Sequence, residues 1–232
     1  MADKINNEEK LLSLFYDPEF HKAKYSKPFT KDGKVCATES HILIVIDKDV
    51  TTGQYEPQEL NIARVIPNDN IKLEIKVSDL ESTLAKLPQV PEEYLISPAE
   101  ECTECDEVCE VQWRYTDKLG RVHYEDFNCP ICHGTGIARS AIYGKTGKSI
   151  PKGTSIVKIQ NGQNFFAQFL HKLLEAAKIL GSDTILYTSQ GIERGNVFTF
   201  TGTFAKSVKV VIMPNQSDAD IMLNTKRLNK AK

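Results

Sequence analysis

Four cysteines in two closely spaced pairs are the residues of this sequence with the clearest chemistry. Two residues separate Cys102 from Cys105 and Cys129 from Cys132, and 23 residues lie between the pairs. A two-residue spacer lets the chain form a knuckle that places two thiolates on one edge of a metal ion. Two knuckles complete a tetrahedron of sulfur ligands, which suits Zn²⁺. The spacing therefore predicts a structural zinc site with no open position for a catalytic water.

Two neighbouring residues offer alternative ligands for this site. Cys109 could replace Cys105 as a thiolate ligand, and His133 follows the second pair directly and offers a ring nitrogen. The sixth cysteine, Cys36, stands apart in a strand-like run, where we expect a small buried hydrophobe.

Patterns typical of enzymes are absent from the sequence. It contains no HExxH, G-x-S-x-G or G-x-G-x-x-G motif, and its five histidines fall in unrelated local contexts. A P-loop-like run at 144–149 has Ile142 where the first glycine is required, and Pro151 interrupts the helix that should follow. We therefore expect a protein without enzymatic activity.

The chain has no apolar run long enough for a signal peptide or a membrane span. This predicts a cytoplasmic protein with reduced thiols and no membrane partner. Its 232 residues, 41% of them hydrophobic, supply a real core and exclude a disordered, collagenous or coiled-coil chain.

Charge is distributed unevenly along the chain, although the net charge is only −2. Residues 1–137 hold 15 basic and 26 acidic side chains, whereas residues 138–232 hold 14 basic and 5 acidic ones. A chain with one basic half can present a basic surface to a polyanion while it remains soluble overall.

The elements that must position these residues follow one order on both sides of the cysteines. Before them we expect strands at 34–38 and 41–46, a strand at 71–77, a helix that starts with a capping box of Ser78 and Glu81, and a further strand that opens at 94–97. After them we expect a strand at 155–159, a helix at 164–180 and strands at 184–188, 196–201 and 207–213. This order predicts an α+β fold with a first half at 1–99, a cysteine-rich insertion at 100–137 and a second half at 138–232.

The second cysteine pair carries a family resemblance. Residues 129–136, Cys-Pro-Ile-Cys-His-Gly-Thr-Gly, fit the pattern C-x-x-C-x-G-x-G and resemble the zinc region of DnaJ-type chaperones. The resemblance implies zinc and a β-hairpin-like finger. It does not imply chaperone activity, because the chain has no His-Pro-Asp pattern of a J domain.

Three other segments of the sequence resemble segments of the bacterial DNA sliding clamp. Residues 35–43 are similar to the clamp phrase V-x-A-T-D-G-H-R-L, with Glu39 and Ser40 for Asp and Gly and Ile42 for Arg. Residues 164–183 resemble its last helix and the strand entry after it, and residues 208–214 resemble its closing V-x-Y-V-V-M-P strand. The resemblance implies two βαβββ units and a non-enzymatic, sequence-independent association with DNA in replication.

A clamp subunit of bacteria has three such domains, so a ring built from this shorter chain would be a homo-oligomer of several copies. Binding to any DNA sequence requires basic side chains aimed at phosphates. We expect these contacts from Lys172 and Lys178 in the last helix and from Lys226 and Arg227 in the basic tail.

A protein-interaction module without nucleic-acid binding is the alternative function. Acidic residues surround the first cysteine pair with no basic residue among them: Glu92, Glu93, Glu100, Glu101, Glu104, Asp106, Glu107 and Glu110. In this interpretation the zinc finger and its acidic face would avoid nucleic acid and bind a protein partner.

Overall fold

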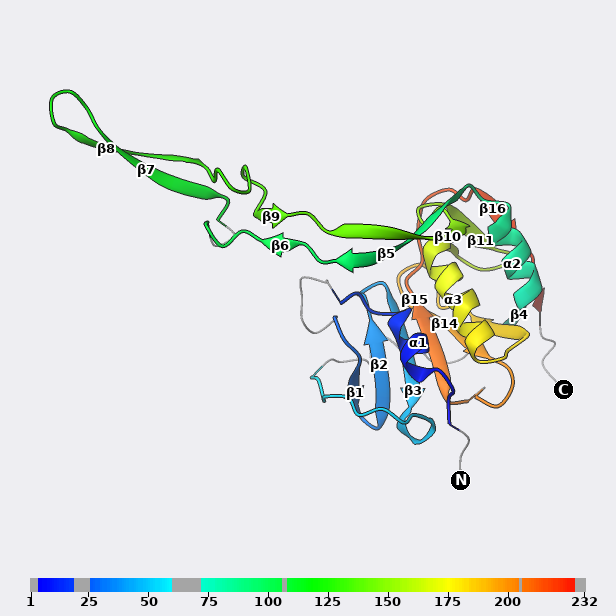
Figure 1. The fold of residues 1–232 in the computed structure, drawn as a ribbon. Coiled ribbons are helices and arrows are strands. Elements are labelled where there is room, and N and C mark those ends of the chain that lie inside the picture. The colour runs from blue at the N-terminus through cyan, green and yellow to red at the C-terminus, as the bar shows by residue number, and fades with distance from the viewer. Residues whose placement is uncertain (1–3, 19–25, 60–71, 106–107, 205, 228–232) are drawn as a thin grey trace. The chain divides into compact units, whose positions relative to one another are not determined.

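In the computed structural model, the chain folds as two compact units (Figure 1). The first, here called the body, comprises residues 1–90 and 150–232, and the second, here called the ribbon unit, is Pro91–Ser149. The structure describes all residues except 1–3, 19–25, 60–71, 106–107, 205 and 228–232. The expected insertion at 100–137 lies inside the ribbon unit.

An eight-stranded antiparallel sheet forms the centre of the body, in the order β1-β2-β3-β15-β14-β13-β4-β17. Its strands are β1 Phe29–Lys31, β2 Lys34–Thr38, β3 Ile42–Asp47, β4 Lys72–Lys76, β13 Thr184–Thr188, β14 Asn196–Phe200, β15 Val208–Ile212 and β17 Lys226–Arg227. Strands from before and after the cysteines are neighbours at β3–β15 and β4–β13. The two ends of the sequence therefore fold as one sheet.

Helices and a small second sheet pack on one face of this sheet and share its main core. The helices are α1 Glu8–Ser13, the short 3-10 helix η2 Lys48–Val50, α2 Val77–Ala85 and α3 Ala167–Ile179. The small sheet has the order β12-β11-β16, with β11 at Ile156–Ile159, β12 at Asn164–Phe166 and β16 at Ile221–Leu223. Among the described helices, none has the length and apolarity needed to cross a bilayer.

Strand β3 is buried on both faces, as its apolar sequence predicts. Ile42, Ile44 and Ile46 belong to the main core, whereas Leu43 and Val45 belong to a smaller cluster on the opposite face. The alternation follows from the two-residue period of a strand. Cys36 lies in the smaller cluster and is fully buried, as expected, and burial raises the pKa of its thiol to about 12.

Both long helices begin elsewhere than the sequence predicts. The expected capping box is wrong, because α2 starts at Val77 with Lys76 as its N-cap and Ser78 lies inside the first turn. The helix expected from residue 164 starts only at Ala167, since Asn164–Phe166 pairs with β11 as β12. Sheet pairing therefore takes priority over the helical periodicity at this boundary.

The order of elements also differs between the two halves. In the second half, β12 and α3 are followed by β13, β14 and β15 of the main sheet. In the first half, α2 is followed directly by strands of the ribbon unit, so the described residues there do not form a βαβββ order. The fold is mostly β with few helices.

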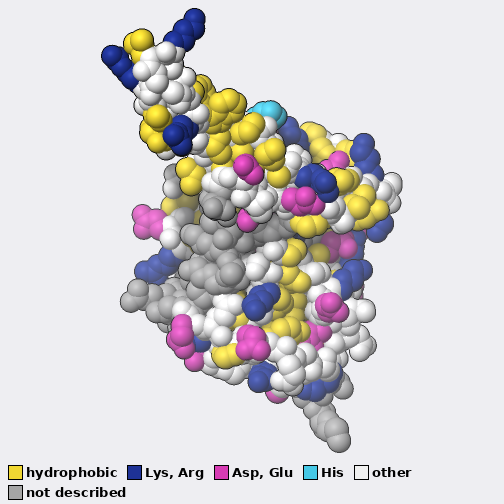
Figure 2. Space-filling model, turned by 60° about the vertical axis from the view of Figure 1, so that its left-hand side comes forward, with side chains coloured by type: hydrophobic (Ala, Val, Ile, Leu, Met, Phe, Trp, Pro, Cys, Tyr) yellow, Lys and Arg dark blue, Asp and Glu magenta, His cyan; other side chains and the backbone are white. Residues whose placement is uncertain are grey.

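The ribbon unit consists of three two-stranded ladders in succession: β5–β10, β6–β9 and β7–β8. The strands are β5 Gln89–Ser97, β6 Glu100–Glu101, β7 Glu110–Thr116, β8 Val122–Asn128, β9 Ile137–Arg139 and β10 Ile142–Pro151. Figure 2 shows hydrophobic side chains gathered on the surface of this unit. A two-stranded ladder has no second layer of its own in which to bury such side chains.

A buried carboxylate joins the N-terminal helix to the loop after η2. Glu8 is only 6% exposed and accepts hydrogen bonds from the Thr52 amide and hydroxyl, the Gly53 amide and the Tyr55 hydroxyl. Burial alone would raise the pKa of Glu8, but the hydrogen bonds from Tyr55, Thr52 and Gly53 outweigh it and lower the pKa. The charged form of Glu8 therefore stabilises the folded body.

Replacing Glu8 by Gln should lower the free energy of unfolding by about 1.5–3 kcal/mol near neutral pH, the usual range for hydrogen bonds to a charged group. Because the folded pKa is depressed, this stabilisation is present above the unfolded pKa and is lost as pH falls through the folded value. Urea unfolding of wild type and Glu8→Gln at several pH values should therefore converge in acid.

Glu9→Gln is the matched control, because Glu9 is the exposed neighbour in the same helical turn. It should leave the unfolding free energy nearly unchanged. A loss as large as that of Glu8→Gln would contradict the role given to the buried carboxylate.

Candidate metal centre

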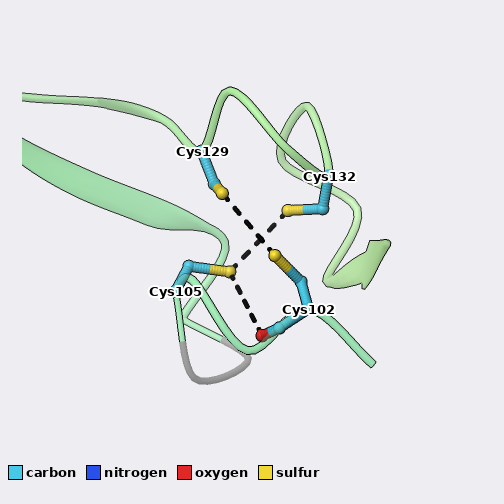
Figure 3. A group of neighbouring side chains, drawn as sticks. All are labelled: Cys102, Cys105, Cys129 and Cys132. Carbon is cyan, nitrogen blue, oxygen red and sulfur yellow. Dashed lines mark hydrogen bonds between the residues drawn. The ribbon is translucent and has the colours of Figure 1, made fainter. Parts of the chain in front are cut away.

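Four buried cysteine side chains converge in the ribbon unit to form the cysteine cluster: Cys102, Cys105, Cys129 and Cys132 (Figure 3). The Cys102 and Cys129 sulfurs are 3.7 Å apart, as are those of Cys105 and Cys132, and all four sulfurs lie within 4.8 Å of one another. Sulfurs about 2.3 Å from a tetrahedral Zn²⁺ would be separated by about 3.8 Å. The cluster thus has the donor set and spacing of a four-thiolate metal site.

Each knuckle is shaped by hydrogen bonds within the backbone. In the second pair, the His133 amide donates to the Cys129 carbonyl at 2.7 Å, and the Thr135 amide donates to the Cys132 carbonyl at 3.0 Å. The chain then turns back through positive φ angles of 83° at Gly134 and 75° at Gly136, which glycine adopts without steric cost. These are the two glycines of the C-x-x-C-x-G-x-G phrase.

Backbone hydrogen bonds also tie the two knuckles together. The Cys102 amide donates to the Gly136 carbonyl at 2.8 Å, and the Cys129 amide donates to the Cys109 carbonyl at 2.9 Å. A Cβ on Gly136 would lie 3.3 Å from the Cys109 sulfur. Cys109 therefore packs beside the cluster through its backbone and its side chain, while its sulfur and the ring of His133 lie outside the group of four ligand atoms.

The surroundings of the cluster favour the thiolate form of Cys132, in the second knuckle. Burial raises the pKa of Cys105 to about 12. At Cys132 burial acts in the same direction, but hydrogen bonds from the Gly136 and Gly134 amides outweigh it and lower the pKa to about 6. A divalent cation at the centre would stabilise all four thiolates, because metal binding displaces thiol protons.

The cluster is also the whole buried interior of its unit. Among the described residues of Pro91–Ser149, the four cysteines are the only side chains in the buried class. Val111 is the one partly buried hydrophobic side chain that packs against them. Metal–sulfur bonds would therefore do for this unit what a hydrophobic core does for the body.

The lysines expected to contact DNA lie on the body and already have acidic partners in two cases. Lys172 pairs with Glu39 of the β2–β3 turn, and Lys178 pairs with Glu81 of α2 at 2.8 Å and with Glu175 at 3.2 Å. Lys226 is exposed in β17. Arg227 occupies the same edge strand, and its side chain lies outside the described residues.

An aromatic face on the β7–β8 hairpin is not among the sites expected from the sequence. Opposed residues of an antiparallel pair project to the same side, so Val111 and Phe127, Trp113 and Glu125, and Tyr115 and His123 share one face. The Trp113 and Phe127 rings lie 5.7 Å apart, and the rings of Tyr115 and His123 stack at 5.0 Å. The alternation of large side chains at every second position was the available signal.

Comparison with family models and with curated proteins finds no match. Among solved structures, the fold is similar to bacterial β sliding clamps. The DNA polymerase β subunit of Streptococcus pyogenes is 11% identical, with a TM-score of 0.42 over 94% of this chain and 68% of that one. The DNA polymerase III β chain of Streptococcus pneumoniae is 12% identical, with the same TM-score over 94% and 66%.

The β sliding clamp of Caulobacter crescentus is 9% identical, with a TM-score of 0.36 over 82% of this chain. The present chain spans only 56% of the length of that clamp.

The full-length protein should bind one Zn²⁺ per chain, and Cys102→Ser or Cys132→Ser should abolish stoichiometric binding because either change removes one of the four sulfurs. Elemental analysis after exhaustive dialysis measures this directly. Hydrogen exchange should show that metal removal unfolds the ribbon unit and leaves the body protected, because the cluster is that unit's interior.

Cys109→Ser and Cys36→Ser are the matched controls, and both should retain full metal content. Zinc that remains after both Cys102→Ser and Cys132→Ser would refute the assignment. Loss of zinc in Cys109→Ser would move the fourth ligand to that residue.

Proposed function

We propose that this protein is a non-enzymatic, sequence-independent DNA-associated factor of the sliding-clamp type, with a structural zinc ion in its ribbon unit. In this role the body associates with duplex DNA during replication, in an assembly of several copies. The zinc ion holds the ribbon unit folded and takes no part in chemistry, because four thiolates leave no position for a substrate.

The main support for the proposal is that the three clamp-like sequence segments lie next to one another in the body. Residues 35–43 form the β2–β3 hairpin and residues 208–214 include β15, which pairs with β3. Residues 164–183 contain α3, whose Lys172 pairs with Glu39 in that hairpin. Segments that are far apart in the sequence are thus neighbours in the fold.

The conformation of the β2–β3 turn further supports the resemblance. Ser40 stands where the clamp phrase has glycine, and its φ is +79°. Backbone in this region favours glycine, because a Cβ is strained there. The position therefore has the conformation that the family's glycine would supply, although this chain carries serine.

Binding to DNA of any sequence would use the basic side chains of the body. Lys172 and Lys178 are held against carboxylates of the same body, so phosphates would have to replace Glu39, Glu81 and Glu175 as their partners. The two Lys178 pairs are largely exposed, and pairs of this kind contribute roughly 0–1 kcal/mol, whereas the Lys172–Glu39 pair is more buried and costs more to exchange. Lys226 and Arg227 would add contacts from the edge strand.

The protein should bind unrelated duplexes with similar affinity, and the logarithm of the binding constant should fall linearly with the logarithm of salt concentration. Replacing both Lys172 and Lys178 by Glu should weaken binding and lower the salt slope by about 2, because two phosphate contacts are lost. Glu81→Gln with Glu175→Gln should tighten binding, because the two changes together remove both carboxylate partners of Lys178. Fluorescence anisotropy with labelled duplexes measures all three effects.

Lys10→Glu with Lys48→Glu is the matched control, since it makes the same charge change at exposed sites of the body. A purely general charge effect would weaken binding equally in the control and in the Lys172 and Lys178 variant, which would contradict the assigned surface. Absence of binding at low salt would refute the proposed function itself.

A further inference from the structure

We propose that the aromatic face of the β7–β8 hairpin is an interface between two copies of this chain, which pack antiparallel about a twofold axis. The occupant is thus a second ribbon unit. The proposal is independent of DNA binding by the body, because it uses residues of Pro91–Ser149 alone.

The apolar side chains of the ribbon unit are the first reason. Of the exposed large hydrophobic residues in the described chain, all but Ile192, Met213 and Met222 lie in this unit. On the hairpin face, Trp113 is 56% exposed, Tyr115 50% and Phe127 47%. Exposed aromatic side chains gathered on one face, here with Glu125 among them, are typical of an interaction site.

The architecture of the hairpin is the second reason. Strands β7 and β8 pair only with each other, and within the described ribbon unit no other strand or helix covers their aromatic face. A two-stranded hairpin is marginally stable by itself and gains stability when its apolar face is buried. An identical hairpin supplies a face of the same composition.

The distribution of charged side chains along the hairpin indicates how the second copy is oriented. The loop at the hairpin tip carries Lys118 and Arg121, whereas the opposite end, beside the cysteine cluster, carries Glu101, Glu104 and Glu110. The described residues provide no ion-pair partner for any of these five side chains. The ribbon unit therefore has a basic tip and an acidic cysteine end.

The acidic residue in the tip, Asp117, reduces this polarity without cancelling it, because two basic side chains there face a single carboxylate. The Asp117 carboxylate accepts hydrogen bonds from the Leu119 and Arg121 amides at 2.9 Å and lies 3.1 Å from Nε2 of His123. The Arg121 amide and His123 lower the pKa of Asp117, so Asp117 stays negatively charged and the tip keeps a smaller net positive charge. The side chains of Lys118 and Arg121 remain available to a partner.

An antiparallel twofold arrangement satisfies both ends at once. Seven residues of β7 extend for about 23 Å, which exceeds the Debye length of about 8–10 Å, so the two ends act as separate charges. A parallel pair would place like charges together. Rotation about a twofold axis through the aromatic face instead places each basic tip beside the partner's acidic end, which makes the surface self-complementary.

Nucleic acid fits this surface less well than a second copy. Residues 91–149 contain 11 acidic and 6 basic side chains, and the acidic ones are concentrated at the cysteine end. A phosphate backbone along the hairpin would meet that end unfavourably.

The test measures the mass of the zinc-loaded, full-length protein by sedimentation velocity under reducing conditions, which prevent a disulfide through Cys109. We expect a reversible dimer. Trp113→Ser with Phe127→Ser should raise its dissociation constant about tenfold or more, because large aromatic side chains dominate such interfaces. Tyr124→Ser is the matched control on the opposite face of the hairpin, and it should leave the dissociation constant unchanged.

Charge reversal tests the antiparallel orientation. Lys118→Glu with Arg121→Glu should weaken the dimer, and so should Glu101→Lys with Glu104→Lys, whereas the four changes together should restore it. Zinc content of each variant checks that the ribbon unit is folded. A monomeric wild type, a dimer that survives the Trp113 and Phe127 changes, or a weak dimer in the fourfold variant would each overturn the proposal.

Discussion

The lack of a hydrophobic interior in the ribbon unit is the constraint on which the structure of that unit depends. Its ladders are two strands wide, and within the described residues only the cysteine cluster is buried. Chains that cannot bury enough apolar surface fold with the help of metals or disulfides. A metal ion bound by the four sulfurs, which have the spacing of a tetrahedral site, would meet that need without a second layer of structure.

The body meets the same need in the usual way, with apolar side chains. Strand β3 carries apolar residues on both faces because β2 and β15 flank it and a hydrophobic cluster lies on each side. Strands from before and after the ribbon unit share this sheet, so the sheet is complete only when both parts of the chain have come together. Polar contacts such as those of Glu8 then fix the loops around it.

The side chains at the surface differ in kind between the two units. On the body, Lys172 and Lys178 sit within ion pairs, and a polyanion would compete with carboxylates for them. On the ribbon unit, aromatic rings lie exposed between a basic tip and an acidic end. The lysines of the body thus lie in ion pairs, whereas the ribbon unit exposes aromatic side chains.

The sequence by itself determined the cysteine pairs, most strands of the main sheet and the existence of the two long helices, because each depends on local spacing or on a short period. Only the tertiary structure decided that Cys109 stays outside the cluster, that Asn164–Phe166 is a strand and that Lys76 rather than Ser78 precedes α2. Likewise, it alone paired Lys172 with Glu39 and placed Trp113 beside Phe127. These outcomes depend on contacts between distant residues, which no local pattern of residue types encodes.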